Sequence, residues 1–223
     1  MKKRGQLPSY YPIFLNIGDR RCVVVGGGQV ALRKVKALLE HMASVEVISP
    51  ELCPELNQLA KRGEIHVLRR GYQAGDLQNA FIVIAATDDS ETNLAVVGEA
   101  RKSAVLANVV DDTDNSDFIL PSYMRRGDVT IAVSTAGKSP ALARKIRTRL
   151  EVVIGAEYAS LALLVDEVRA DVKRKGINLN GDIWQEALDP DLLIDLIKKG
   201  DKKKAKAVLL SNLKTGRNNI EVD

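Results

Sequence analysis

The chain has 223 residues, 45% of them hydrophobic and 28% charged, which is enough to bury a core and excludes a chain that is disordered throughout. Its 33 Lys and Arg residues against 29 Asp and Glu residues give a formal charge of +4, which favours an acidic partner over a basic one. Cys22 and Cys53 form no metal-binding motif, and no apolar run approaches the roughly 20 residues of a membrane span, so we expect a reduced, soluble, cytoplasmic protein.

Residues 22–110 alternate short apolar stretches with amphipathic ones, a pattern typical of a parallel sheet with helical crossovers. The five predicted strands cover residues 22–25, 45–49, 65–70, 81–86 and 105–110.

The predicted helices of this region begin at recognisable signals. The first covers residues 29–43, and its polar face carries Arg33, Lys34 and Lys36. Its apolar face consists of Ala31, Val35, Leu38, Leu39 and Met42. Pro54 suits the first turn of a second helix, and Asp89 or Ser90 caps a third over residues 90–102.

After Asp111 the pattern changes. "DDTDNSD" is a polar loop, and the short strands in "FILPSYM" and "VTIAVS" flank a turn at "RRGD". Ser139 and Pro140 start a long helix, and everything from about residue 157 is predicted to be helical. We therefore predict a Rossmann-like α/β domain over residues 1–113, a small α+β unit over 114–150 and a C-terminal helical domain over 151–223.

The stretch "VVVGGGQVALRK" indicates a dinucleotide-binding turn, because Gly26, Gly28 and Ala31 follow the G-x-G-x-x-G/A spacing between a strand and a helix. Gly26 permits the tight turn, and Gly28 lets a pyrophosphate approach the backbone. The N–H groups of Gln29 and Val30 would meet the phosphates at the helix N-terminus. A glycine turn that only packs a crossover is the alternative, but it would not need three consecutive glycines.

The second strand lacks the acidic residue that usually binds the ribose hydroxyls at its end. "VEVISPE" continues through Ser49 and Pro50 to Glu51, so either Glu51 or backbone groups of this loop would bind the ribose. No arginine follows immediately to bind a 2′-phosphate, which favours NAD over NADP as the cofactor.

Two further strand ends carry polar residues at the sheet edge where ligands bind in such folds. Thr87 and Asp88 either border the nicotinamide or act as ordinary turn and capping residues. Asn108, Asp111 and Asp112 follow at the next strand end, where a carboxylate could accept a proton during hydride transfer or simply form a turn. We expect His41 and His66 to be structural, and no metal-ligand cluster is visible.

Several motifs in the same order give the chain a family resemblance. The stretches "YPIFLNIGDRRCVVVGGGQVALRKVKALLE", "FIVIAATDD", "NVVDD", "FILPS" and "IAVSTAGKSPALARKIRTRLE" resemble the precorrin-2 dehydrogenases, which also form the N-terminal part of siroheme synthases. The resemblance covers roughly residues 10–150.

The resemblance implies an NAD-dependent oxidation of precorrin-2 to sirohydrochlorin, which in some members is followed by insertion of ferrous iron to give siroheme. It implies a catalytic role for Asp111 and a position near the tetrapyrrole for Ser134. It also implies a homodimer joined through residues 114–150. Precorrin-2 is a polycarboxylate, and the segment after Ser134 is basic through Lys138, Arg144, Lys145, Arg147 and Arg149, although a solvated helix face explains at least the last two.

Two alternatives remain open. A Rossmann module that senses NAD without catalysis would explain residues 1–110 but not the motifs that follow. The basic run at residues 198–206 is either a polyanion-binding segment or a solvated helix end, and the absence of interleaved aromatic residues disfavours a nucleic-acid partner.

Overall fold

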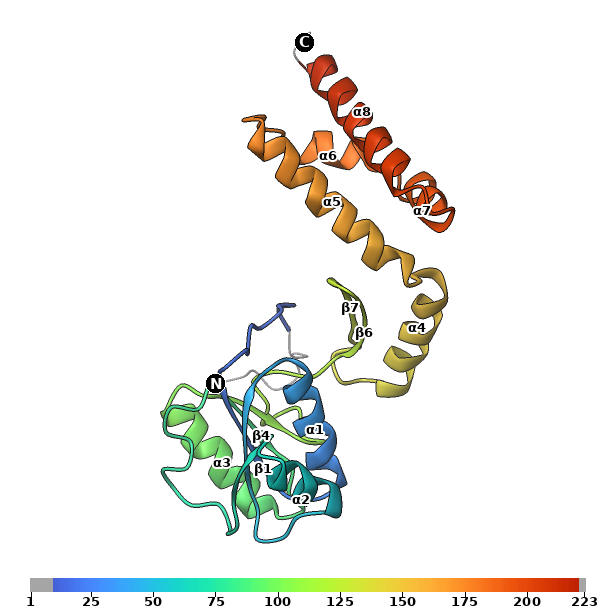
Figure 1. Ribbon diagram of the computed structural model, residues 1–223. Coiled ribbons are helices and arrows are strands. Elements are labelled where there is room, and N and C mark those ends of the chain that lie inside the picture. The colour runs from blue at the N-terminus through green and yellow to red at the C-terminus, as the bar shows by residue number, and fades with distance from the viewer. Residues whose placement is uncertain (1–9, 221–223) are drawn as a thin grey trace. The chain divides into compact units, whose positions relative to one another are not determined.

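The protein is described by a computed structural model that covers residues 10–220 (Figure 1). The chain divides into two compact units, Met1–Leu120 and Pro121–Asp223.

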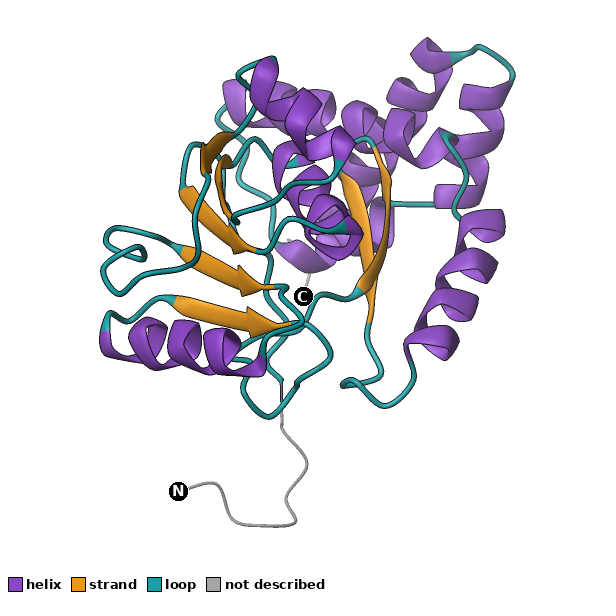
Figure 2. Ribbon diagram, turned by 90° about the horizontal axis from the view of Figure 1, so that it is seen from below, coloured by secondary structure: helices purple, strands orange, loops and turns teal. Residues whose placement is uncertain are grey.

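The first unit is built on a five-stranded sheet in the order β3-β2-β1-β4-β5, with every neighbouring pair parallel. Figure 2 shows strands of this sheet as arrows that run in the same direction. In chain order the elements are β1 (Arg21–Val25), α1 (Gln29–Glu40), β2 (Ser44–Ile48), α2 (Pro54–Lys61), β3 (His66–Leu68), β4 (Ile82–Ala85), α3 (Ser90–Lys102) and β5 (Leu106–Val109). The predicted Rossmann-like fold class is confirmed.

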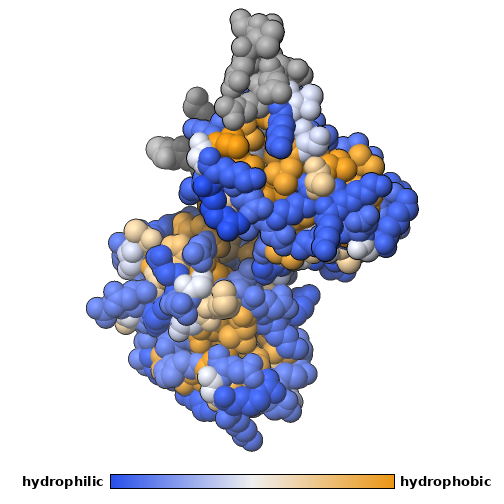
Figure 3. Space-filling view, turned by 45° about the horizontal axis from the view of Figure 1, so that its top comes forward, coloured by the Kyte–Doolittle hydropathy of each residue, from blue (hydrophilic) through white to orange (hydrophobic). Residues whose placement is uncertain are grey.

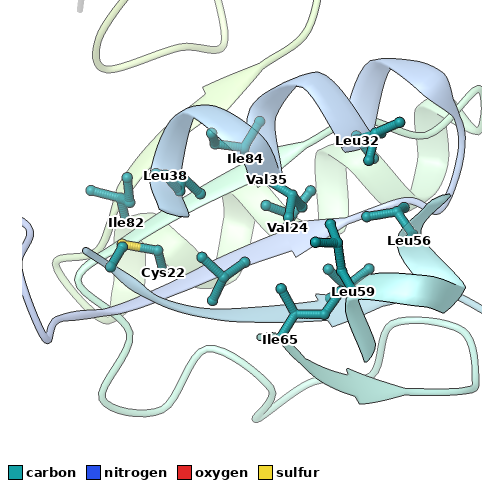
Figure 4. Close-up of a cluster of buried hydrophobic side chains, with 14 residues drawn as sticks. Cys22, Val24, Leu32, Val35, Leu38, Leu56, Leu59, Ile65, Ile82 and Ile84 are labelled. Carbon is teal, nitrogen blue, oxygen red and sulfur yellow. The ribbon is translucent and has the colours of Figure 1, made fainter. Parts of the chain in front are cut away.

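Both faces of this sheet are buried, because side chains alternate across each strand. Val24 of β1 packs with α1 and α2, around Val35 and Leu56, on the face drawn in Figure 4. Its neighbour Val23 points to the opposite face and packs with Val96 of α3. The reversal of strand order between β1 and β4 therefore sends the helices that follow these strands to opposite faces, which opens a crevice at the carboxyl edge.

Helix α1 ends earlier than the apolar spacing predicts. His41 follows the last helical residue, and Met42 adopts a φ of +59° with 76% of its surface exposed. The prediction of Met42 on the apolar face is therefore wrong, and Leu32, at 4% exposure, is buried on that face instead. Beyond the helix, the backbone carbonyl of Met42 accepts a hydrogen bond from Asp19 N at 2.8 Å.

The second unit pairs an antiparallel hairpin with a helical bundle. The hairpin consists of β6 (Ser122–Arg126) and β7 (Val129–Val133), and the helices are α4 (Pro140–Val153), α5 (Glu157–Arg174), α6 (Gly181–Ala187), α7 (Pro190–Lys198) and α8 (Lys202–Ile220). Leu164, Leu193 and Leu209 form the centre of its core. Hydrophilic side chains cover much of the visible surface, with apolar side chains between them (Figure 3).

The segment "FILPS" belongs mainly to the first unit. Phe118 packs against the α1 face of the sheet, its carbonyl accepts a hydrogen bond from Asn108 Nδ2 at 3.0 Å, and β6 starts only at Ser122. Pro121 has no N–H to donate to a strand partner, which fits a strand that begins after it. The division into domains at 113/114 and 150/151 stays a prediction.

Within residues 10–220, the helices are all too short or too polar to cross a bilayer.

Ion pairs fasten the sheet at β1 and β2. Glu46 of β2 pairs with Arg21 of β1 and lies 2.9 Å from His66 Nδ1, and Arg21 also donates to the carbonyls of Asp76 and Gln78. Glu46 has 14% of its side chain exposed, so this cluster is partly shielded from solvent.

We expect Glu46→Gln to destabilise the first unit by about 1–2 kcal/mol, because Arg21 would lose its charged partner while remaining partly buried. Native-state hydrogen exchange of the β1 and β2 amides measures this effect. The matched control is Glu64→Gln, which removes the exposed pair with Arg62 and should change exchange by less than about 0.5 kcal/mol. Equal effects of the two substitutions would contradict a role for the cluster.

Candidate dinucleotide site

The glycine turn after β1 lies at the crevice between β1 and β4, and two of its glycines are required by the protein itself. A Cβ on Gly26 would lie 2.3 Å from the carbonyl oxygen of Ala86, and Gly26 has a φ of +127°. A Cβ on Gly27 would lie 1.8 Å from the carbonyl oxygen of Glu51. The turn is therefore pressed between the segments that follow β4 and β2, and Gly27, to which the spacing argument gave no role, is as constrained as Gly26.

Gly28 differs from its two neighbours because nothing in the protein requires it. A Cβ there meets no atom within 4 Å, and its φ of −85° is open to any residue. The helix that it caps has no side-chain N-cap and no acidic residue in its first turn, so no side chain of residues 10–220 occupies the N–H groups of Gln29 and Val30. By contrast, Asp89 caps α3 with its carboxylate. An open surface beside free N–H donors fits a dinucleotide pyrophosphate.

The loop after β2 is tied to the glycine turn by backbone bonds. Cys53 N donates to the Gly27 carbonyl at 2.8 Å, and the buried Ser49 hydroxyl donates to the Glu51 carbonyl at 2.7 Å. The side chains of Pro50 and Glu51 remain exposed at this sheet edge. Glu51 is thus in the region where a ribose would lie, and its contact with the ribose stays a prediction.

Thr87 follows β4 and is held by the start of α3. Its hydroxyl donates to Asn93 Oδ1 at 2.8 Å and accepts from Asp89 N at 3.2 Å, while its carbonyl accepts from Asn93 Nδ2 at 3.0 Å. These bonds favour the capping interpretation of the Thr87 side chain. The backbone of Thr87 still lies beside the turn, since its N is 3.4 Å from a Cβ built on Gly26.

The end of β5 separates the three polar residues that the sequence groups together. Asn108 is buried and donates to Phe118, and Asp112 accepts hydrogen bonds from Asp114 N, Asn115 N and Asn115 Nδ2. Those bonds, with the Asn115 side chain first, lower the pKa of Asp112. The side chains of Asn108 and Asp112 therefore form hydrogen bonds that stabilise this loop. Of the two aspartates, Asp111 is the one whose carboxylate is available for proton transfer.

Asp111 has a φ of +60° and is exposed directly after the sheet edge. Among the described residues, no hydrogen bond is formed by its carboxylate. Aspartate tolerates this left-handed conformation better than most residues, which suits it to the position.

The helical pattern predicts Lys34 on the solvent face of α1, and this prediction is wrong. Lys34 is half-buried on α1, burial lowers its pKa, Arg33 lowers it further, and the charge of Asp111 opposes both effects. Lys34 and Asp111 thus interact electrostatically across segments far apart in the sequence. Helical periodicity could not show this, because it describes one helix and not its neighbours.

Ser134 and Lys138 lie in the second unit, in the loop between β7 and α4. The exposed Ser134 hydroxyl accepts a hydrogen bond from Ala136 N at 3.0 Å, and Lys138 is exposed. Ser139 caps α4 by accepting from Leu142 N, as predicted. Arg147 pairs with Glu151, whereas Arg144, Lys145 and Arg149 are exposed.

The basic run at 198–206 is largely neutralised by acidic residues of the second unit. Lys198 and Lys202 pair with Glu157 and Glu167 of α5, and Lys206 pairs with Asp171 of the same helix. These pairs favour the interpretation of the run as a solvated helix end over a polyanion-binding segment. Within the described residues, no group of three or more His, Cys, Asp or Glu side chains is placed to hold a metal ion.

Comparison with known proteins shows which families the chain resembles. The sequence model of a family described as "Putative NAD(P)-binding" matches residues 13–122, and that of "Sirohaem biosynthesis protein central" matches residues 126–152. The siroheme synthases of Chromobacterium violaceum and Thioalkalivibrio sulfidiphilus are 40% and 41% identical over 93% of this chain. The predicted resemblance to the siroheme synthases is confirmed.

The chain matches less than half of the length of these relatives. The chain spans 44% and 42% of the length of those two siroheme synthases. A solved structure named SirC, precorrin-2 dehydrogenase, shares the fold, with a TM-score of 0.67 at 24% identity over 92% of this chain and all of that one. The match of residues 13–122 to a family described as NAD(P)-binding confirms the predicted nicotinamide dinucleotide cofactor, in agreement with the geometry around Gly28.

Substitution by alanine should have different effects at Gly27 and Gly28. We expect Gly28→Ala to leave thermal stability nearly unchanged but to weaken NAD binding at least about 10-fold, because its methyl group would fill the space for the pyrophosphate. Gly27→Ala should destabilise the fold by about 1–3 kcal/mol, because the Glu51 carbonyl must move. Thermal melting and calorimetric titration with NAD measure both effects. Undiminished NAD affinity in Gly28→Ala would contradict this placement of the cofactor.

Proposed function

We propose that this chain catalyses the NAD-dependent dehydrogenation of precorrin-2 to sirohydrochlorin. The observation that carries the proposal is the position of Asp111, a carboxylate outside the hydrogen bonds of its loop, at the same sheet edge as the cradle around Gly28. The relation to siroheme synthases supports the substrate, and the family model supports the cofactor.

The proposed reaction removes one hydride and one proton from precorrin-2. The nicotinamide ring supplies the hydride acceptor, so NAD is reduced to NADH. The N–H groups at the start of α1 bind the pyrophosphate, and Glu51 or its loop backbone binds the adenosine ribose. Asp111 accepts the proton as general base, with the half-buried Lys34 of α1 as its cationic neighbour.

The second unit supports the proposed substrate and assembly. The exposed cations Lys138, Arg144 and Lys145 suit a polycarboxylate, with Ser134 in the loop before them. Leu142 and Ile146 share one face of α4 and are 52% and 38% exposed, which supports a homodimer joined through residues 114–150. A cytoplasmic location is part of the same proposal.

The test is anaerobic incubation of the protein with precorrin-2 and NAD. We expect NADH absorbance and the sirohydrochlorin spectrum to appear together, and Asp111→Asn to lower kcat by about 10²–10⁴-fold with unchanged NAD affinity. Asp112→Asn is the matched control, because it alters a carboxylate engaged in the loop and should affect stability more than the chemical step. Tight NAD binding without turnover or tetrapyrrole affinity would instead support the sensing module.

Insertion of ferrous iron into sirohydrochlorin is a second activity to test, since the exposed Asp111 could also accept protons from the pyrrole nitrogens. If the chain is a chelatase, metal insertion by the wild type should exceed the uncatalysed rate, and Asp111→Ala should remove most of the excess. A rate independent of enzyme concentration would exclude this activity.

A further inference from the structure

An arginine stands beside the adenosine end of the candidate site. Strands β2 and β3 are parallel, Ile48 is in register with Leu68, and Ser49 N donates to the Leu68 carbonyl at 3.1 Å. Arg69 therefore leaves β3 at the sheet edge where Ser49 leaves β2. Although 20 positions separate these residues in the chain, they follow neighbouring strand ends.

The side chain of Arg69 is held toward the loop after β2. Its Nη2 donates to Asn57 Oδ1 at 2.6 Å. Asn57 Nδ2 in turn donates to the carbonyls of Leu52 and Cys53 at 2.9 and 3.3 Å. Since Cys53 N is bonded to Gly27, a short series of hydrogen bonds connects the guanidinium to the phosphate-binding turn.

Arg69 differs from other arginines of this region in its hydrogen-bond partner, which is neutral rather than anionic. Arg62 pairs with Glu64, Arg21 pairs with Glu46, and Arg70 forms two hydrogen bonds with Asp76 at 2.7 and 2.6 Å. For Arg69, the partner that the described residues supply is the neutral Asn57 amide, and its side chain is exposed. A positioned guanidinium without an anionic partner is suited to bind a phosphate.

The residue directly after β2 carries no negative charge that would repel a 2′-phosphate. Enzymes selective for NAD often place a carboxylate there, which binds the 2′-hydroxyl and repels a 2′-phosphate. Here the position is Ser49, which is buried with its hydroxyl turned back onto the Glu51 carbonyl. The nearest carboxylate along the chain is that of Glu51, on the exposed part of the loop.

We propose that Arg69 binds the 2′-phosphate of NADP, so that this site accepts NADP as well as NAD. Asn57 is the positioning residue for Arg69. At the adenosine ribose, Glu51 contacts the 2′-hydroxyl of NAD, and Arg69 contacts the 2′-phosphate of NADP. This inference rests on the cofactor site of the proposed function and extends its specificity.

The experiment is calorimetric titration of the full chain with NAD and NADP, and with 5′-AMP and adenosine 2′,5′-bisphosphate, which differ only by the 2′-phosphate. The variants are Arg69→Gln, Asn57→Ala and Glu51→Gln. Arg62→Gln is the matched control, because it removes another exposed arginine, one that already has a carboxylate partner.

For the wild type we expect NADP to bind within about 10-fold of NAD. Arg69→Gln should weaken NADP and the bisphosphate about 10- to 100-fold, the effect of losing charge-assisted hydrogen bonds, and change NAD and 5′-AMP less than about twofold. Asn57→Ala should give a smaller selective loss, and Glu51→Gln should have the opposite preference by weakening NAD and strengthening NADP.

Two outcomes would overturn the inference: a wild type that binds NAD but not NADP, or an Arg69→Gln variant that loses affinity for both equally, as a purely structural tie to Asn57 would. Either result leaves the proposed dehydrogenase intact, since NAD still binds or the loss is common to both cofactors. Absence of binding by both NAD and NADP in the wild type would count against the proposed function itself.

Discussion

The close approach of three backbone segments at the glycine turn is the constraint on which the rest of the first unit depends. Gly26 contacts the segment after β4, and Gly27 contacts the segment after β2, at distances that leave no room for a Cβ. Gly26 N also donates to the Ile48 carbonyl at 2.9 Å. Because these contacts are made by backbone, the strand ends and the start of α1 are held in one arrangement, and Gly28 is presented to the crevice.

The polar groups around this crevice divide into those that hold the edge and those left for ligands. Asn108, Asp112 and the Thr87 hydroxyl are occupied by hydrogen bonds within the protein. Polar groups in a partly buried edge must be paired, and these pairs keep the loops ordered. Asp111 and Arg69, one anionic and one cationic, stay available at opposite ends of the edge, where a proton acceptor and a phosphate ligand would be needed.

The second unit follows a different physical principle. Its core is formed by α5–α8 around leucines such as Leu164 and Leu209, and lysines of α7 and α8 pair with acidic residues of α5. Such exposed pairs add little energy individually. They do explain why a strongly basic run is largely neutralised, while the cations near the start of α4 remain exposed.

Local sequence patterns determined the parallel α/β organisation, the glycine spacing and the caps at Asp89 and Ser139, because alternation, helical periodicity and capping involve residues a few positions apart. The family resemblance added the proposed substrate and singled out Asp111 among the carboxylates that follow the fifth predicted strand. Only the tertiary structure decided that Gly27 is pressed on Glu51, that Lys34 is half-buried near Asp111, that Asp112 is occupied by its own loop, and that Arg69 reaches the loop after β2. These features depend on contacts between segments distant in the chain, which leave no periodic signal in either segment. For the same reason, the residues that directly follow β2 in the sequence do not reveal Arg69, which follows β3.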